Sequence, residues 1–169
     1  MSESESLPRV LIVDDEENIL NMFQRSLRKD FEVITTAKPS EAIEIMKKQK
    51  VDGIIIDFEL PEISGSELIK TIRRNMSYDY VPILVLTAHE THMAVTSSFQ
   101  SGADGFLAKP ATVAEVRVKM LELMHSQKFS RSLKQRLSRE KYSNKGNSAS
   151  ESSEEIPSVK TEPHPPDQD

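Results

Sequence analysis

Short apolar runs alternate with stretches of helical periodicity along most of the chain. Five of these runs predict strands, at residues 9–13, 31–36, 51–57, 81–87 and 104–108. The run IIID, which follows a turn-forming Asp-Gly pair, is typical of a strand buried on both faces of a parallel sheet. The alternation in FEVITT predicts a strand at the edge of the sheet instead.

Between the strands, apolar residues recur at the spacing of one helix face. Two pairs, Ser64 with Glu67 and Thr112 with Glu115, predict capping boxes that begin helices. Residues 91–101 predict a helix built from weak helix formers. The expected inner faces are Ile19, Leu20, Phe23 and Leu27; Ala42, Ile43 and Met46; Leu68, Ile69 and Ile72; and Val113, Val116, Met120 and Leu123.

Five strand–helix units in series predict an α/β fold with a doubly wound, five-stranded parallel sheet. We expect the strand order 2-1-3-4-5 of a flavodoxin-like (βα)5 domain, followed by a C-terminal extension. The domain itself is expected over residues 8–127, after a disordered N-terminus at 1–7. Residues 128–145 form a basic, helix-compatible extension, and residues 146–169 an acidic Ser/Pro-rich tail.

Composition separates the same parts of the chain. Hydrophobic residues concentrate in residues 1–127, so only this part can bury a core that offsets its chain entropy. Residues 128–145 carry seven Lys or Arg against Glu140, a net charge of +6, and residues 146–169 carry −5. With a total of −5, residues 1–127 carry −6. The tail is expected to be disordered.

The cellular compartment is indicated by three features that the sequence lacks: cysteine, a long apolar run and a secretory signal. Its 169 residues include no Cys, which excludes disulfides and thiolate zinc sites. No apolar run reaches the roughly 20 residues that a transmembrane helix needs. The N-terminus MSESESLPR is polar and acidic, unlike a secretory signal. We therefore expect a soluble cytoplasmic protein with no transmembrane segment.

Polar residues end four of the predicted strands: Asp14-Asp15, Asp57, Thr87 and Lys109. The carboxyl ends of parallel strands lie along one edge, so three carboxylates should converge there. Such a cluster is unfavourable without a cation, and an oxygen-only donor set favours Mg²⁺. A divalent cation, a lysine and a hydroxyl together suit phosphoryl transfer, with Asp57 as the best candidate nucleophile.

These residues resemble the receiver domain of two-component response regulators, over about residues 8–127. The resemblance rests on Asp14-Asp15, on the D-x-x-x-P-x-x-x-G spacing of Asp57, Pro61 and Gly65, and on Thr87-Ala88, Phe106 and Lys109-Pro110. It implies a phosphorylation switch, not an enzyme with its own metabolic substrate. We interpret the chain as a stand-alone receiver whose output is binding a partner or passing the phosphoryl group on.

The resemblance also implies roles for individual residues. Asp57 would take a phosphoryl group from a phosphohistidine of a histidine kinase or histidine phosphotransfer protein. Mg²⁺ would be held by Asp15 and Asp57 directly, by Asp14 through water, and by the backbone carbonyl of Glu59. Lys109 and Thr87 would contact the phosphoryl oxygens. The Lys109-Pro110 peptide bond is expected to be cis.

The switch implied by the resemblance is a coupled movement. Thr87 would approach the phosphoryl oxygens and Phe106 would turn inward, changing the surface around residues 91–101 and 104–108. The inward state of Phe106 would rest on packing, because its ring has no hydroxyl. The chain is expected to be a monomer or a phosphorylation-dependent dimer, with an unknown downstream protein partner.

Other interpretations stay open. The aspartates could merely cap turns or helices, and His89 and His92 are expected to be solvated loop residues instead of a ligand pair. A haloacid-dehalogenase-type phosphatase also uses a strand-end aspartate as its nucleophile. That family has a D-x-D motif first and an acidic pair last, whereas here Asp57-Phe58-Glu59 comes after Asp14-Asp15. The chain could be a partner-binding module with lost or secondary phosphorylation. Nucleic-acid affinity through residues 128–145 is a further, unfavoured alternative.

Overall fold

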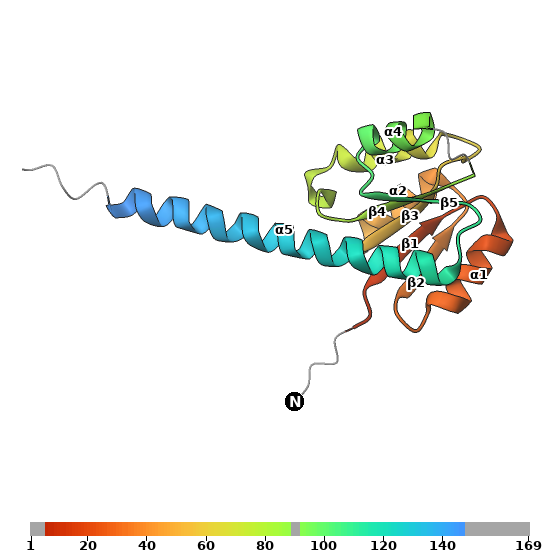
Figure 1. Ribbon diagram of the computed structural model, residues 1–169, viewed down its shortest axis with the longest axis horizontal. Helices are drawn as coiled ribbons and strands as arrows, with labels where there is room; N and C mark the ends of the chain where they lie inside the picture. The colour runs from red at the N-terminus through yellow and green to blue at the C-terminus, as the bar shows by residue number, and fades with distance from the viewer. Residues whose placement is uncertain (1–5, 89–91, 148–169) are drawn as a thin grey trace, which may run out of the picture. The chain divides into compact units, whose positions relative to one another are not determined.

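The computed structural model of the protein describes residues 6–88 and 92–147, without the side chains of 92–95 and 139–147 (Figure 1). The expected acidic tail and N-terminus lie almost wholly outside these residues, as does His89. The chain divides into two units, Met1–Leu133 and Lys134–Asp169. Within the described ranges, no helix combines the length and the apolarity that crossing a bilayer requires.

The sheet has five strands in the order β2-β1-β3-β4-β5, and every neighbouring pair is parallel. This confirms the predicted fold class and strand order. Each strand either matches its apolar run or begins one or two residues later, where its pairing with a neighbouring strand begins. The bounds are β1 (Arg9–Val13), β2 (Glu32–Thr36), β3 (Gly53–Asp57), β4 (Ile83–Thr87) and β5 (Gly105–Ala108).

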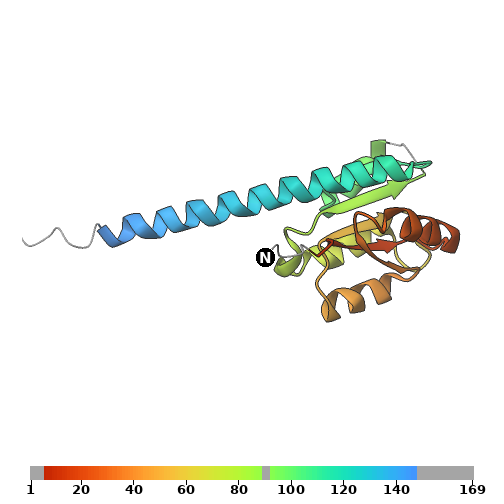
Figure 2. The ribbon, with the colours of Figure 1, turned by 90° about the horizontal axis from the view of Figure 1, so that it is seen from below.

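Five helices connect and follow the strands, and Figures 1 and 2 show helices on both sides of the sheet. They are α1 (Glu17–Leu27), α2 (Pro39–Lys48), α3 (Gly65–Arg73), α4 (His92–Ser101) and α5 (Val113–Asn147). The boundary expected between residues 127 and 128 falls inside α5. A short 3₁₀ turn, η1 (Met76–Tyr78), was not predicted, and the Tyr78 hydroxyl donates to the Met46 carbonyl over 2.9 Å.

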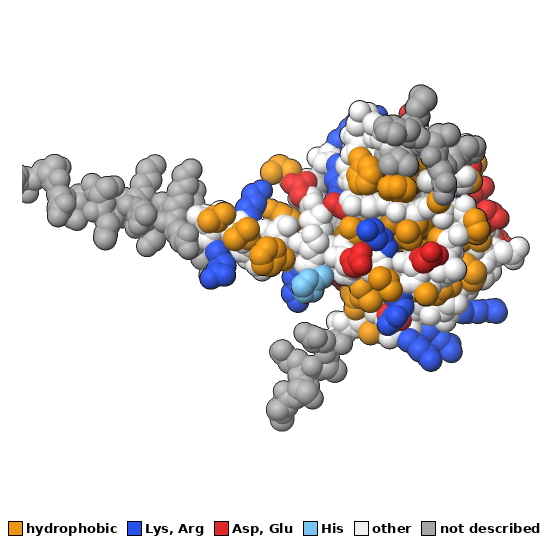
Figure 3. Space-filling view, viewed as in Figure 1, with side chains coloured by type: hydrophobic (Ala, Val, Ile, Leu, Met, Phe, Trp, Pro, Cys, Tyr) orange, Lys and Arg blue, Asp and Glu red, His pale blue; other side chains and the backbone are white. Residues whose placement is uncertain are grey.

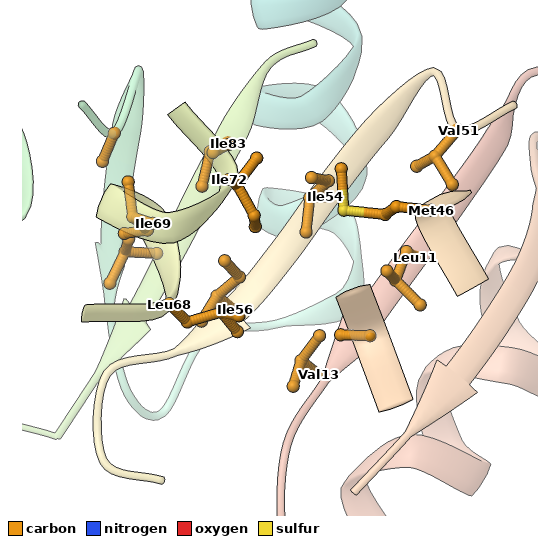
Figure 4. Packing of buried hydrophobic residues seen from close by; sticks show 13 residues of the cluster. Leu11, Val13, Met46, Val51, Ile54, Ile56, Leu68, Ile69, Ile72 and Ile83 are labelled. Atoms are coloured by element: carbon orange, nitrogen blue, oxygen red, sulfur yellow. The ribbon is translucent and has the colours of Figure 1, made fainter. Parts of the chain in front are cut away.

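Alternate residues of each central strand face opposite sides, so the sheet separates two hydrophobic clusters. On one side, Ile54 and Ile56 of β3 pack with residues of α2 and α3, among them Met46, Leu68 and Ile72 (Figure 4). The other cluster joins the sheet to α1 and α5; its members include Ile12, Leu20, Phe23, Leu27, Ile55, Leu84, Val116 and Met120. The predicted inner helix faces are therefore largely the observed ones.

Local signals start and end the helices as expected. The side chain of Ser64 accepts from the Glu67 backbone N–H, and the Glu67 carboxylate accepts from the Ser64 N–H. Thr112 and Glu115 form the same reciprocal pair before α5. Helix α4 ends at Ser101, and the next residue, Gly102, has a φ of 104°, in the left-handed region that glycine adopts without strain.

Asp104 binds several elements together ahead of β5. Its Oδ2 accepts from the Arg73 guanidinium over 2.7 Å and from the Ile83 backbone N–H over 2.8 Å. Its Oδ1 accepts from the Gln127 amide over 2.6 Å. The half-buried carboxylate therefore joins α3, β4 and α5 at the edge of the sheet where the strands begin.

Candidate functional site

The strand-end residues named by the sequence meet at the carboxyl edge of the sheet. Asp14 directly follows β1, Asp57 is the last residue of β3, Thr87 is the last of β4, and Lys109 directly follows β5. β1 and β3 are neighbours, as are β3 and β4, so the strand order brings these ends together.

Three carboxylates lie within reach of one another here. One carboxylate oxygen from each of Asp14, Asp15 and Asp57 falls within 4.8 Å of the other two. Asp14 is 1% exposed and Asp57 is 5% exposed, whereas Asp15 is open to solvent. Two buried acids and one exposed acid therefore line the bottom and the rim of the same site.

Lys109 bridges the two buried carboxylates. Its Nζ lies 3.0 Å from Asp14 Oδ2 and 3.0 Å from Asp57 Oδ2, and 4.0 Å from a carboxylate oxygen of Glu16. The lysine side chain is only 20% exposed, so these pairs are poorly screened by water. One ammonium cannot neutralise three carboxylates, and the cluster keeps an excess negative charge.

Backbone N–H groups fix the second oxygen of each buried acid. The Glu16 N–H donates to Asp14 Oδ1 over 2.9 Å, and the Glu59 N–H donates to Asp57 Oδ1 over 3.2 Å. The Lys109 N–H donates to the Thr87 carbonyl over 2.7 Å, which joins the ends of β4 and β5. The orientations of the carboxylates are thus set before any ligand arrives.

Gly65 lets the loop after β3 fold back against the site. Its N–H donates to the Phe58 carbonyl over 3.0 Å. A Cβ at this position would lie 2.6 Å from the carbonyl oxygen of Asp57 and 2.9 Å from the Phe58 Cα. Both are backbone atoms that cannot rotate away, so the close approach of α3 to the end of β3 requires glycine.

The environment shifts the proton affinities of the bridged pair. Burial raises the pKa of Asp57 above its ordinary value; the hydrogen bond and charge of Lys109 oppose that rise, and the charge of Asp14 adds to it. Burial alone lowers the pKa of Lys109, but Asp14 and Asp57 outweigh it and raise that pKa above its ordinary value. Lys109 is therefore held as a cation, while the Asp57 carboxylate is destabilised by its own burial.

Thr87 and Phe106 lie on the neighbouring strands β4 and β5, offset by two positions in register. Thr87 is 1% exposed and pairs in register with Ala108, and Phe106 is partly buried two residues earlier in β5. The Phe106 ring makes an edge-to-face contact with Phe99 of α4, at 5.8 Å between centroids and 88° between planes. This contact links β5 to α4, and the Phe99 ring is also exposed at the surface.

The donor chemistry of the cluster suits a hard divalent cation. All the offered ligand atoms are oxygens, and the three carboxylates exceed the charge of Lys109. Such sites favour Mg²⁺ with retained water over softer metals. No histidine belongs to the cluster among the residues that the structure describes.

A family model described as the response regulator receiver domain matches residues 10–121. The chain belongs to this family. The receiver is 32% identical over 117 residues to the alkaline phosphatase synthesis transcriptional regulatory protein PhoP of Bacillus subtilis, covering 69% of this chain and 48% of that protein. It is 36% identical over 117 residues to the transcriptional regulatory protein PrrA of Mycobacterium tuberculosis, covering 68% and 49%. The chain spans about half the length of these curated relatives.

Among solved structures, the receiver is similar to the chemotaxis response regulator CheY4 of Vibrio cholerae. The match has a TM-score of 0.67 and 30% sequence identity, and it covers 70% of this chain and 99% of that one. The family predicted from the strand-end residues and the fold predicted from the strand–helix pattern are thereby confirmed. The receiver is a signalling domain rather than a classical enzyme.

The Lys109-Pro110 peptide bond is cis, as the resemblance implied. Sequence reasoning did not single out Glu16, whose carboxylate lies near Lys109 and whose N–H orients Asp14. The sequence feature that could have identified Glu16 is its position directly after the Asp14-Asp15 pair. The helix expected at residues 91–101 begins at His92 among the described residues, so His92 is a helix residue and not the loop residue that was expected. Its side chain is not among those that the structure describes.

Proposed function

We propose that Asp57 accepts a phosphoryl group from a phosphohistidine of a histidine kinase or histidine phosphotransfer protein. The observation that carries this proposal is the pairing of Asp57 Oδ2 with Lys109 Nζ at 3.0 Å beside Asp14 and Asp15. An Asp57 carboxylate oxygen would attack phosphorus while the phosphorus–nitrogen bond breaks. The imidazole nitrogen would leave with the bonding electrons and take a proton from water, so that it ends as neutral histidine.

The chain's own residues can serve each requirement of that transfer. Asp14, Asp15, Asp57 and the backbone carbonyl of Glu59 would hold Mg²⁺. When bound, the cation supplies positive charge to the phosphoryl oxygens. The raised pKa of Lys109 keeps its side chain protonated. Its ammonium would move from the Asp57 carboxylate to a phosphoryl oxygen. The Glu59 N–H, already bonded to Asp57 Oδ1, holds the carboxylate in place for attack.

The output of the switch would involve α4 and β5. An aspartyl phosphate adds three acceptor oxygens, which the Thr87 hydroxyl can approach as a donor. We propose that Phe106 then leaves its edge-to-face contact with Phe99 and turns inward. This change would alter the surface formed by α4 and β5 and its affinity for a partner protein in the cytoplasm.

A phosphorylation assay tests the transfer. The protein would be incubated with Mg²⁺ and acetyl phosphate, a small phosphoryl donor, and its intact mass recorded. We expect one added phosphoryl group that hydroxylamine removes, as it removes acyl phosphates. Asp57→Asn should stay unmodified, and Asp79→Asn, which changes an exposed acid elsewhere, should be modified like the wild type. Equal modification of Asp57→Asn would refute the assignment.

A separate measurement tests the switch. NMR spectra of ring-labelled phenylalanine would be compared before and after adding beryllofluoride with Mg²⁺. We expect large shifts for Phe99 and Phe106 and small shifts for Phe31, which is buried on the α1 side of the sheet. Unchanged Phe99 and Phe106 signals in a protein that accepts the phosphoryl group would remove the switch and leave the transfer intact.

A further inference from the structure

A groove lies at the edge of the sheet opposite the acidic cluster, where the strands begin. Its cavity measures about 410 Å³, within the range of small-ligand sites. Pro8 precedes β1, Asp52 precedes β3 and Pro82 precedes β4, and all three line it. Residues of α5 form the other wall, and the cavity is open to solvent.

Positive charge dominates this groove. Its lining includes Lys50, Lys128 and Arg131 against the single acid Asp52. Asp52 is already matched, because Lys50 Nζ lies 2.7 Å from its Oδ1 and the Arg9 N–H donates to its Oδ2 over 2.9 Å. Within the described part of the chain, neither Lys128 nor Arg131 forms an ion pair. Two cations therefore remain for a ligand.

The groove also offers an aromatic and apolar surface. The Arg131 guanidinium lies over the ring of Tyr80, at 5.9 Å from the centroid. Such stacking orients the cation while leaving its N–H groups available for an anion. Met124, Pro8 and Pro82 add nonpolar atoms to the same cavity. Figure 3 shows hydrophobic and basic side chains side by side on the described part of α5.

Hydrogen bonds hold the α5 wall in place. Gln127 lines the groove and donates to Asp104, which in turn is held by Arg73 and by the Ile83 N–H. Lys128 follows Gln127 directly in the helix, and Arg131 lies one turn further along. The positions of their backbones are thus set by the same network, and a ligand would meet a preformed site.

We propose that this groove binds a short acidic and partly apolar peptide segment of a partner protein. Carboxylates of the segment would pair with Lys128 and Arg131, and an apolar side chain would pack on Met124 and Tyr80. A long polyanion such as nucleic acid fits less well, because its phosphate backbone would leave the nonpolar atoms of Pro8, Pro82 and Met124 in the groove without a partner. A short segment that carries both acids and an apolar side chain matches the cations and the nonpolar atoms together.

Selection from a displayed library of short random peptides tests the proposal on the whole chain. The matched variants are Lys128→Gln with Arg131→Gln, and the control Arg28→Gln with Lys29→Gln, which removes the same charge from exposed positions after α1. We expect selected peptides rich in Asp or Glu and apolar residues. Their affinity should fall about tenfold or more in the groove variant and stay unchanged in the control.

NMR titration of the wild-type protein with a selected peptide locates the site. We expect shifts at Tyr80, Gln127 and Arg131, and tripolyphosphate should not displace the peptide at equal concentration. The proposal fails if selection returns no acidic sequences, or if both variants bind alike. It also fails if tripolyphosphate binds the groove and the peptide does not, which would mark a phosphate site. None of these readouts needs phosphoryl transfer, so they are independent of the function of Asp57.

Discussion

Lys109 Nζ lies 3.0 Å from Asp57 Oδ2, although 52 residues separate the two in the chain. The same nitrogen lies 3.0 Å from Asp14 Oδ2, 95 residues away. One ammonium thus joins the ends of β1, β3 and β5 into a single site. This bridge makes Lys109 both a structural counter-ion and the cation that would meet an incoming phosphoryl group.

Replacing Lys109 should impair phosphoryl transfer. For Lys109→Gln we expect phosphorylation by acetyl phosphate to slow roughly 100-fold, because a donor aimed at the transferring oxygens is lost. Lys109→Arg keeps a cation and should retain more activity. The rate of phosphoryl incorporation, followed by intact mass, measures the effect. Lys47→Gln removes an exposed lysine from α2 and should react like the wild type; a wild-type rate in Lys109→Gln would contradict the role.

Mg²⁺ should stabilise the fold through the acidic cluster. A cation that binds only the folded state at 100 times its Kd adds about 2.7 kcal/mol to the free energy of unfolding. Urea denaturation with and without Mg²⁺ measures this gain. We expect Asp15→Asn, which removes the exposed carboxylate, to reduce the gain without disturbing the core.

The matched control for that experiment is Glu62→Gln, an exposed acid in the loop after β3 that belongs to no cluster of the described residues. It should keep the full Mg²⁺ gain. An undiminished gain in the triple variant Asp14→Asn, Asp15→Asn and Asp57→Asn would place the cation elsewhere.

Gly65→Ala should destabilise the domain by about 1–3 kcal/mol, since its Cβ would meet the Asp57 carbonyl oxygen at 2.6 Å. The backbone shift that relieves this clash also moves Asp57, so phosphorylation should slow. Gly105→Ala is the comparison: its Cβ would meet the flexible Leu123 side chain at 3.0 Å, which can adjust. Urea denaturation of both variants decides the matter, and an equal or smaller loss in Gly65→Ala would contradict the steric argument.

Asp52 should give the domain a pH-dependent increment of stability. Burial alone raises the pKa of Asp52, but Lys50 and the Arg9 N–H outweigh it and hold that pKa below the ordinary value of 3.8. A lowered pKa in the folded state stabilises the fold above the unfolded-state value. That stability is lost as the pH falls through the folded pKa.

Asp52→Asn should therefore cost roughly 0.5 kcal/mol at neutral pH, as for a partly exposed pair, and nothing at pH values below the folded pKa. Urea denaturation across this pH range measures the difference between variant and wild type. Asp79→Asn, at an exposed position, should show no such trend. A constant difference at all pH values would mean that packing, not charge, explains the cost.

Much of the fold was predictable because it depends on local patterns. Burial of a central strand on both faces requires an uninterrupted apolar run, and Ile54, Ile55 and Ile56 are fully buried as their run indicated. The capping boxes at Ser64 and Thr112 follow from neighbours three residues apart. The convergence of Asp14, Asp15 and Asp57 follows from strand order, which the serial strand–helix pattern restricts strongly.

Other features could not be derived from such patterns. No sequence spacing indicates that Asp104 accepts from Arg73, Ile83 and Gln127, or that Arg131 stacks on Tyr80. These contacts join segments whose separation depends on helix packing and on loop paths, and both are set by the whole core at once. Similarly, the sequence predicted a glycine-containing motif, but the 2.6 Å approach to the Asp57 carbonyl is a property of the folded loop.

By itself, the sequence determined most of the buried residues, the five strands and five helices of the described chain, and which side chains end the strands. Those properties depend on hydrophobic periodicity and on residues close together in the chain. Only the tertiary structure decided that one lysine bridges two buried aspartates and that a basic groove forms at the opposite edge of the sheet. Both depend on distances between remote segments, which are fixed only when the sheet and its helices pack together.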